Sequence, residues 1–176
     1  VLWEMIEDPD CHVVMTLSGA MTIAKMGKII TKMIDEGMVQ CIISTGALMA
    51  HGLSESVGKT HYRHDPAMSD EELFRKGYNR VYDTLEMESN LNYVEHVVAQ
   101  TLKRLDQDQP LSSAVLTREI GKTLAEELDS DGILKSAYMK KVPVYIPAFT
   151  DSEVGLDMGT WAMAREVDRA RSQVGP

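Results

Sequence analysis

The sequence predicts an α/β protein with a parallel sheet flanked by helices. Short runs of apolar and β-branched residues alternate with segments of helical periodicity, as in chains that build parallel sheets. Small residues follow the first two runs, where each strand would turn into a helix. At 176 residues the chain fits one domain of ordinary size. No apolar run approaches the roughly 20 residues that a membrane span needs.

The first 58 residues contain two strand-turn-helix units. Residues 11–17 (CHVVMTL) are expected to form a buried strand, a tight turn follows at 18–20, and 21–36 has helical spacing. Residues 38–45 (MVQCIIST) form the second predicted strand, and a second helix opens at Gly46 and fades near Gly58. This order implies a parallel sheet with right-handed crossovers.

The rest of the chain is mainly helical, with one further strand. Residues 142–148 (VPVYIPA) form the third predicted strand, whose two prolines favour an edge position. The other expected elements are a loop at 59–69, a helix capped by Ser69 and running to Lys76, a helix at 89–105, a break at Gln107–Pro110, a helix capped by Ser112 or Ser113 and ending at Leu128, a short helix at 131–141, a loop at 150–153 and a last helix at 159–171.

Composition narrows the classes of function. The formal net charge is −9, and no concentrated basic stretch is present, so nucleic-acid binding is not expected. The N-terminus lacks the features of a signal peptide. Cys11 and Cys41 lie in apolar runs and are predicted to be buried thiols, which suggests a reducing, cytoplasmic setting. A start at Val1 and an end at Pro176, just after a helix-like segment, predict a fragment that is incomplete toward its C-terminus.

Candidate binding residues lie at the expected carboxyl ends of the strands, where parallel sheets bind ligands. Ser18-Gly19-Ala20 and Ser44-Thr45-Gly46 suit a phosphate, because small residues admit close backbone approach; an ordinary strand-helix turn is the alternative. Asp151 and Asp157, expected on the loop after the third strand, could bind a ribose hydroxyl and a ligand ammonium, or serve as turn formers.

The histidines offer one candidate. His51 follows the second turn and could point into the crevice toward a substrate. His61 and His64 have the spacing of metal ligands but lack an evident third ligand, so a solvated loop is expected and no metal site is predicted. No nucleophile and base stand out by spacing, and no catalytic residue is predicted.

Four separated stretches resemble one family. They are TLSGAMTIAKMGKIITKMIDEGMV, CIISTGALMAHGL, ELFRKGYNRVYDTL and VPVYIPAFTDSEVGLDM, and they span nearly the whole chain in family order. The last is the most specific, because it carries a Pro-Ala-x-Thr-Asp stretch with a second aspartate shortly after. The chain resembles deoxyhypusine synthase, and more closely its bacterial deoxyhypusine synthase-like branch.

This resemblance implies a fold and a reaction. The family has a Rossmann-like domain that binds NAD and forms a homotetramer with active sites between subunits. It oxidises spermidine, carries the aminobutyl group on an enzyme lysine as an imine, and passes it to an acceptor amine. The acceptor is a lysine of a translation factor in deoxyhypusine synthase and a diamine such as putrescine in homospermidine synthases. Residues 1–176 would then be part of a single NAD-binding α/β domain.

Carried over by position, Ser18-Gly19-Ala20 and Ser44-Thr45-Gly46 fall on the family's NAD-contacting turns. Asp151 falls on an aspartate that holds NAD, and Asp157 on a carboxylate near the polyamine. The chain departs from the family where Gly19-Ala20 replaces Ser-Asn and Ala50-His51-Gly52 replaces an acidic cluster. The family's catalytic lysine lies C-terminal to the matched part. A non-catalytic partner subunit of the same family is therefore the alternative.

Overall fold

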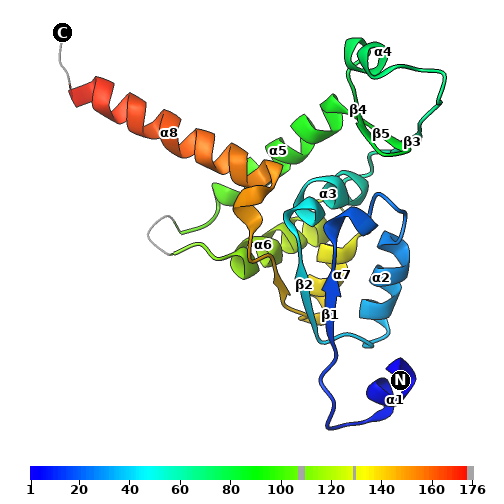
Figure 1. Ribbon diagram of the computed structural model, residues 1–176. Coiled ribbons are helices and arrows are strands. Elements are labelled where there is room, and N and C mark those ends of the chain that lie inside the picture. The colour runs from blue at the N-terminus through cyan, green and yellow to red at the C-terminus, as the bar shows by residue number, and fades with distance from the viewer. Residues whose placement is uncertain (107–109, 129, 174–176) are drawn as a thin grey trace.

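The computed structural model describes residues 1–106, 110–128 and 130–173, and side chains as far as residue 166. Three parallel strands, β1 (Val14–Leu17), β2 (Cys41–Ser44) and β6 (Val144–Tyr145), form one sheet in the order β1-β2-β6 (Figure 1). The predicted α/β class is confirmed, and β6 lies at an edge. The strands are shorter than expected, and strand pairing is confined to these residues.

Helices pack on this sheet and on one another. Ile34, Ile42, Leu116, Ile120 and Ile146 are fully buried and belong to one core. The helical elements are α1 (Leu2–Glu7), η1 (Gly19–Met21), α2 (Gly27–Asp35), η2 (Gly46–Met49), α3 (His51–Ser56), α4 (Asp70–Arg75), α5 (Glu88–Leu102), α6 (Ser113–Glu126), α7 (Ile133–Lys140), η3 (Phe149–Asp151) and α8 (Glu153–Gln173).

One face of the parallel sheet is open. Ile42 and Val144 point into the helical layer and are buried, whereas Val14, Ile43 and Tyr145 on the opposite face are 47%, 38% and 44% exposed. Parallel sheets are normally covered on both faces. The prediction of wholly buried strands is therefore wrong for this face of the described chain.

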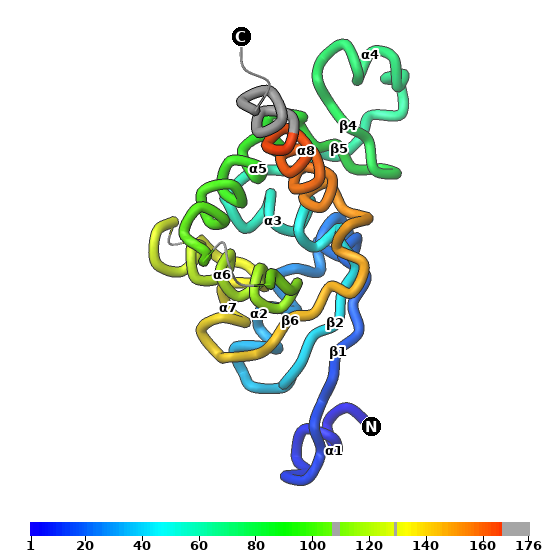
Figure 2. Tube along the Cα trace, turned by 90° about the vertical axis from the view of Figure 1, so that its left-hand side faces the viewer, coloured from blue at the N-terminus to red at the C-terminus, as the bar shows by residue number. Residues whose placement is uncertain are grey.

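A small lobe projects from the body (Figures 1 and 2). It contains α4 and an antiparallel sheet in the order β3-β5-β4, formed by β3 (Tyr62–Arg63), β4 (Tyr78–Val81) and β5 (Thr84–Met87). Ser69 caps α4 in a capping box with Glu72, as its sequence position predicted. The sheet was not predicted, because its strands are short and carry polar residues, and because the hairpin turns at Tyr82 with a left-handed φ of 57°.

Several predicted helices begin at other residues. The helix expected from Met21 starts at Gly27, because Lys25 has a left-handed backbone with φ 63°. The helix expected at 46–58 divides into η2 and α3 at Ala50, whose φ of −101° and ψ of −89° are not helical. The last helix starts at Glu153 rather than at Gly159.

The remaining predictions concern a cap, a break and the thiols. Ser112 caps α6 by accepting a hydrogen bond from the Val115 N–H. The break expected at Gln107–Pro110 falls mostly outside the described residues. Cys11 and Cys41 are unpaired and half-buried rather than buried.

Within the described ranges, no helix combines the length and the apolar character that crossing a membrane requires.

Side chains of α6 fasten the edge strand β6. The Thr117 hydroxyl donates to the Val144 carbonyl at 2.8 Å, and the Ile146 N–H donates to the Ser113 hydroxyl at 3.1 Å. Because β6 pairs with one neighbour only, these bonds replace part of a sheet ladder.

We expect Thr117→Val to lower the free energy of unfolding by about 1 kcal/mol, since it keeps the shape but removes the hydroxyl donor. Thr16→Val, at an exposed position on β1, should change it by less than about 0.5 kcal/mol. Urea unfolding of both variants measures the difference. Equal stability of the two would show that the α6 hydroxyl does not hold β6.

Candidate functional site

The turns after the three parallel strands pack together at the carboxyl end of the sheet. The N–H of Gly19, after β1, donates to the Thr45 hydroxyl, after β2, at 2.9 Å. The Thr22 hydroxyl closes the first turn by donating to the Gly19 carbonyl at 2.7 Å. The third turn, η3, contacts η2. Residues that the sequence placed at separate strand ends therefore share one edge.

The two glycines of these turns allow that packing. A Cβ atom on Gly19 would lie 2.1 Å from the Leu48 backbone nitrogen, and one on Gly46 would lie 2.4 Å from the Ser152 Cβ atom. Protein atoms thus fill the space that each glycine leaves. Gly19 and Gly46 bring the turns into contact, rather than leaving room for a ligand beside their own Cα atoms.

Other predicted residues of this edge remain accessible. Ser18, Ala20, Thr45 and Asp151 are exposed, whereas Ser44 is buried. The structure thus leaves the Ser18, Thr45 and Asp151 residues accessible at this edge, with the Thr45 hydroxyl already accepting a hydrogen bond from Gly19.

Asp157 lies in the second turn of α8, so its expected place on the strand-end loop is wrong. Helix α8 begins earlier than predicted because the Ser152 hydroxyl caps it, accepting a hydrogen bond from the Gly155 N–H at 3.2 Å. Asp157 therefore shares the first turns of α8 with Glu153.

These two half-buried carboxylates lie among other acids. Burial and then the Glu95 carboxylate raise the pKa of Asp157. Burial raises the pKa of Glu153, and the neighbouring Asp157 and Glu88 carboxylates raise it further. Glu88 and Glu95 belong to α5, which contacts α8 (Figure 1). The result is an acidic surface in which burial and neighbouring carboxylates destabilise the charges of Glu153 and Asp157.

His51 joins this surface to a buried carboxylate. Its Nδ1 atom lies 2.5 Å from the Oε2 atom of Glu86 on β5. The Glu86 side chain is completely buried, whereas that of His51 is 22% exposed. Glu86 therefore binds the Nδ1 side of the His51 ring, while part of the ring remains exposed to solvent.

Glu86 also contacts a second histidine. The Nε2 atom of His61 lies 3.3 Å from Glu86 Oε1, and both side chains are fully buried. The expectation that His61 belongs to a solvated loop is therefore wrong. Behind His61, its Nδ1 atom lies 3.0 Å from the Lys25 Nζ atom, and Lys25 forms an ion pair with Glu55. His64 stands apart, with its Nε2 atom 3.2 Å from the Met68 carbonyl.

These contacts keep Glu86 ionised. Burial alone would raise its pKa, but the hydrogen bond from His51 and the neighbouring His61 and Ser54 side chains outweigh that effect and lower the pKa from 4.5 to about 2. A buried carboxylate with two histidine partners is a strong point of attachment between the lobe and the body.

No pattern along the chain predicts this network. Glu86 lies between the apolar residues Leu85 and Met87, in a strand that the sequence pattern does not predict. It is also 35 residues away from His51 along the chain. Lys25 was placed within a helix. Among the described residues, no three histidine, cysteine, aspartate or glutamate side chains are arranged to hold a metal ion.

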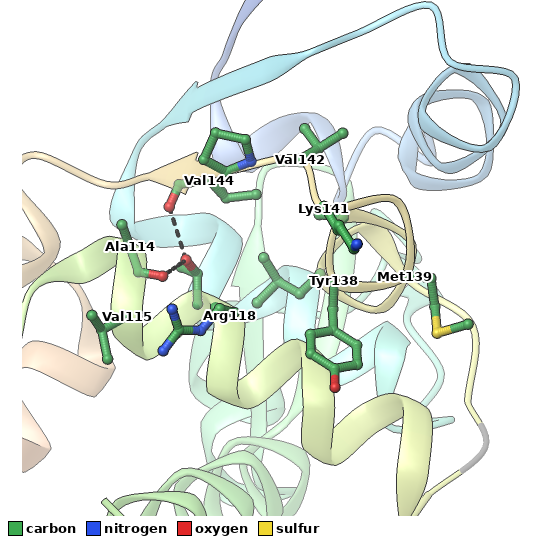
Figure 3. Close-up of a pocket in the computed structure, with 12 residues that line it drawn as sticks. Ala114, Val115, Arg118, Tyr138, Met139, Lys141, Val142 and Val144 are labelled. Carbon is green, nitrogen blue, oxygen red and sulfur yellow. Dashed lines mark hydrogen bonds between the residues drawn. The ribbon is translucent and has the colours of Figure 1, made fainter. Parts of the chain in front are cut away.

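A separate hollow of about 490 Å³ lies between α6, α7 and the amino end of β6 (Figure 3). Its lining is mostly apolar, with Arg118, Tyr138 and Lys141 among the labelled side chains. It lies at the end of the strand opposite to the turns, and its charged groups include two cations. It is therefore not the site formed by the predicted residues.

Comparisons with known proteins agree on the family. The family model described as deoxyhypusine synthase matches residues 1–173. The chain belongs to the deoxyhypusine synthase family. It is 34% identical over 157 residues to the "Probable deoxyhypusine synthase 2" of Methanosarcina acetivorans, which covers 88% of this chain and 45% of that protein. It is 33% identical over 173 residues to the deoxyhypusine synthase-like protein of Elusimicrobium minutum, covering 97% and 45%.

Solved structures support the fold. A deoxyhypusine synthase structure from Entamoeba histolytica superposes with a TM-score of 0.60 at 12% identity, covering 89% of this chain and 48% of that one. An arginine dihydrolase from cyanobacteria reaches a TM-score of 0.52 at 12% identity, covering 87% and 18%. The chain thus spans about half the length of its deoxyhypusine synthase relatives.

We predict that Gly46→Ala lowers the free energy of unfolding by about 1–3 kcal/mol, because the added methyl group meets Ser152. Gly159→Ala is the matched control: no atom lies within 4 Å of a Cβ atom there, and alanine favours the helix by roughly 1 kcal/mol. Thermal unfolding compares the two. A Gly46→Ala protein as stable as the wild type would contradict the close packing of η2 on Ser152.

A second prediction concerns acid stability. The pKa of Glu86 is lower in the folded protein than its usual 4.5, so its contribution to stability is complete above pH 4.5 and is lost as the pH falls toward 2. Glu86→Gln should be less stable than the wild type at pH 7, and the difference should shrink between pH 4.5 and 2. Glu166→Gln, at an exposed position on α8, is the control. A difference that stays constant over this interval would exclude an ionised Glu86 as its source.

Proposed function

We propose that this chain is part of an NAD-dependent transferase that moves the aminobutyl group of spermidine to an acceptor amine. Family membership supports this general activity. The observation that carries the polyamine assignment is the acidic surface formed by Glu153 and Asp157 on α8 with Glu88 and Glu95 on α5. The pKa values of Glu153 and Asp157 are raised by burial and by nearby carboxylates, and a ligand with several positive charges would relieve this repulsion.

Spermidine suits this surface by chemistry. Its ammonium groups can form charge-assisted hydrogen bonds to carboxylates, and its methylene links can lie against the apolar parts of α8. We assign Asp157 and His51 to the polyamine. Asp157 would bind an ammonium group, and His51, open on the same side, would lie near the reacting amine.

We assign the strand-end groups to NAD, in agreement with the rule that ligands of parallel sheets bind beyond the carboxyl ends of strands. Ser18, Ala20, Thr45 and Asp151 fit this role, because they are exposed at that edge. Ser44, Gly19 and Gly46 would support the turns from within. NAD would accept the hydride that leaves the polyamine.

Part of this site would come from residues beyond this chain. The open sheet face carrying Val14, Ile43 and Tyr145 needs a cover, and the relatives are about twice as long. We infer that the cover is the other half of a family chain, which would also bring the catalytic lysine. In the same proposal, residues 1–176 are part of a single NAD-binding α/β domain. The protein that contains it assembles as a homotetramer and is cytoplasmic.

A non-catalytic partner subunit is the second candidate. Protein atoms occupy the space beside Gly19 and Gly46, which limits backbone approach by a pyrophosphate. The experiment that separates the two candidates is incubation of the natural-length protein with NAD and spermidine, followed by borohydride. Mass spectrometry should find one reduced aminobutyl group on a lysine. Added putrescine should yield homospermidine if the acceptor is a diamine. Failure to trap any imine would leave the partner subunit as the better account.

We expect Asp157→Asn to raise the KM for spermidine about tenfold or more, because it removes one charge-assisted hydrogen bond worth about 1.5–3 kcal/mol. The KM for NAD should stay unchanged. Glu166→Gln, on the exposed surface of the same helix, should alter neither value. Steady-state kinetics measure both constants. An unchanged KM for spermidine in the Asp157→Asn protein would remove this residue from the polyamine site.

A further inference from the structure

The hollow between α6, α7 and the amino end of β6 (the α6–α7 hollow) is separate from the strand-end turns and from the acidic surface (Figure 3). Its volume of about 490 Å³ is that of a small-molecule site, and such sites are mostly apolar with a few polar groups. Leu134, Ala137, Val142 and Val144 belong to its apolar lining. A molecule bound here would therefore need an apolar body.

The charged side chains in the lining are both cations. Arg118 comes from α6 and Lys141 directly follows α7, so the two reach the hollow from different elements (Figure 3). The Nε and Nη2 atoms of Arg118 lie 2.9 Å from the neighbouring Glu119 carboxylate, and the Tyr138 hydroxyl donates to Glu126 at 3.0 Å. Lys141 forms no ion pair with any side chain that the structure describes. Its charge is therefore available to a ligand.

The backbone at Lys141 is unfavourable for a lysine. Its φ of 57° is left-handed, at the position after a helix where glycine is preferred. The Lys141 N–H donates to the Tyr138 carbonyl and the Val142 N–H to the Ala137 carbonyl, which are the two hydrogen bonds of a Schellman motif. A Cβ atom destabilises this left-handed conformation relative to glycine.

Three other helices of the same chain are followed by glycine in this conformation. Gly37 after α2, Gly58 after α3 and Gly77 after α4 have φ values of 73°, 79° and 72°. A cation at a helix C-terminus gains from the helix dipole, but Lys140 already supplies one in the last turn of α7. Folding of α7 thus gives little reason for a lysine at position 141, whereas a ligand in the α6–α7 hollow gives one.

We propose that the α6–α7 hollow binds a small organic carboxylate, with an aliphatic body between α6, α7 and β6 and its carboxylate at the Lys141 ammonium. A charge-assisted hydrogen bond from Lys141 orients the ligand, and the Nη1 atom of Arg118 offers a second donor. The aliphatic body matches a lining made mostly of aliphatic side chains. This site shares no residue with the strand-end turns or the acidic surface, so it does not depend on the proposed function.

Binding of octanoate to the natural-length protein tests the proposal. We expect a dissociation constant on the order of 1 mM or tighter for this ligand of about ten non-hydrogen atoms. Octylamine has the same chain with a positive head group and should bind at least about tenfold more weakly. The methyl resonance of Met139, which lines the hollow, should shift with octanoate. Absence of octanoate binding, or binding that leaves the Met139 resonance unchanged, would overturn the proposal.

Substitutions at position 141 separate a binding role from a structural one. Lys141→Asn keeps a residue that tolerates the left-handed backbone but removes the charge, so octanoate should bind about tenfold more weakly or worse. Lys141→Gly should lose binding equally, while its Tm should equal or exceed that of the wild type, because glycine relieves the backbone. Lys140→Asn is the matched control: its side chain does not line the hollow, and octanoate should bind it as it binds the wild type.

A substitution on α6 tests the hollow without changing charge. Ala114 belongs to the lining, and Ala114→Phe should abolish octanoate binding by filling the space for the aliphatic chain. If Ala114→Phe does not fold, the two Lys141 variants still decide. Octanoate binding that survives in both Lys141 variants would overturn the assignment of the carboxylate. A Lys141→Gly protein with a clearly lower Tm would show that lysine serves folding, and would contradict the binding role.

Discussion

The buried carboxylate of Glu86 is the interaction on which the arrangement of the site depends. Removing a charge from water costs several kcal/mol unless partners replace the lost hydration. His51 from α3 and His61 from the segment before β3 are those partners. One side chain thereby ties the projecting lobe to the body and fixes the histidine that opens on the acidic surface. The sheet of the lobe is separate from the parallel one, so this side-chain contact joins the two parts where no strand pairing does.

Close packing of the strand-end turns is the second constraint. Gly19 and Gly46 let η1, η2 and the start of α8 approach to distances that a side chain would prevent. This packing places η3, which contains Asp151, against η2. It also directs α8 across α5, so that carboxylates from both helices meet. The cofactor and polyamine assignments therefore depend on the same piece of packing, although their residues lie far apart in the sequence.

The sequence predicted the parallel sheet because its strands are apolar, β-branched and followed by small residues, and those signals are local. It predicted the Ser69 and Ser112 caps for the same reason. Glu86 and the burial of His61 could not be foreseen, because their partners are 35 and 25 residues away along the chain. The helix start at Gly27 was missed because the left-handed Lys25 reflects tertiary contacts rather than propensity. Asp157 was placed on a loop because the Ser152 cap was not recognised. Sequence patterns indicate which face of a helix or strand is buried and where the element ends. The histidine-carboxylate network instead depends on contacts between residues that are distant in the sequence.

We propose that the strand-end turns and the first turns of α8 form one ligand site. Hydrogen exchange of the natural-length protein, followed by mass spectrometry, tests it most directly. NAD should slow exchange in segments 18–22 and 45–51, and adding spermidine should extend the protection to 153–158. Protection by both ligands elsewhere in the protein, with these segments unchanged, would contradict the account.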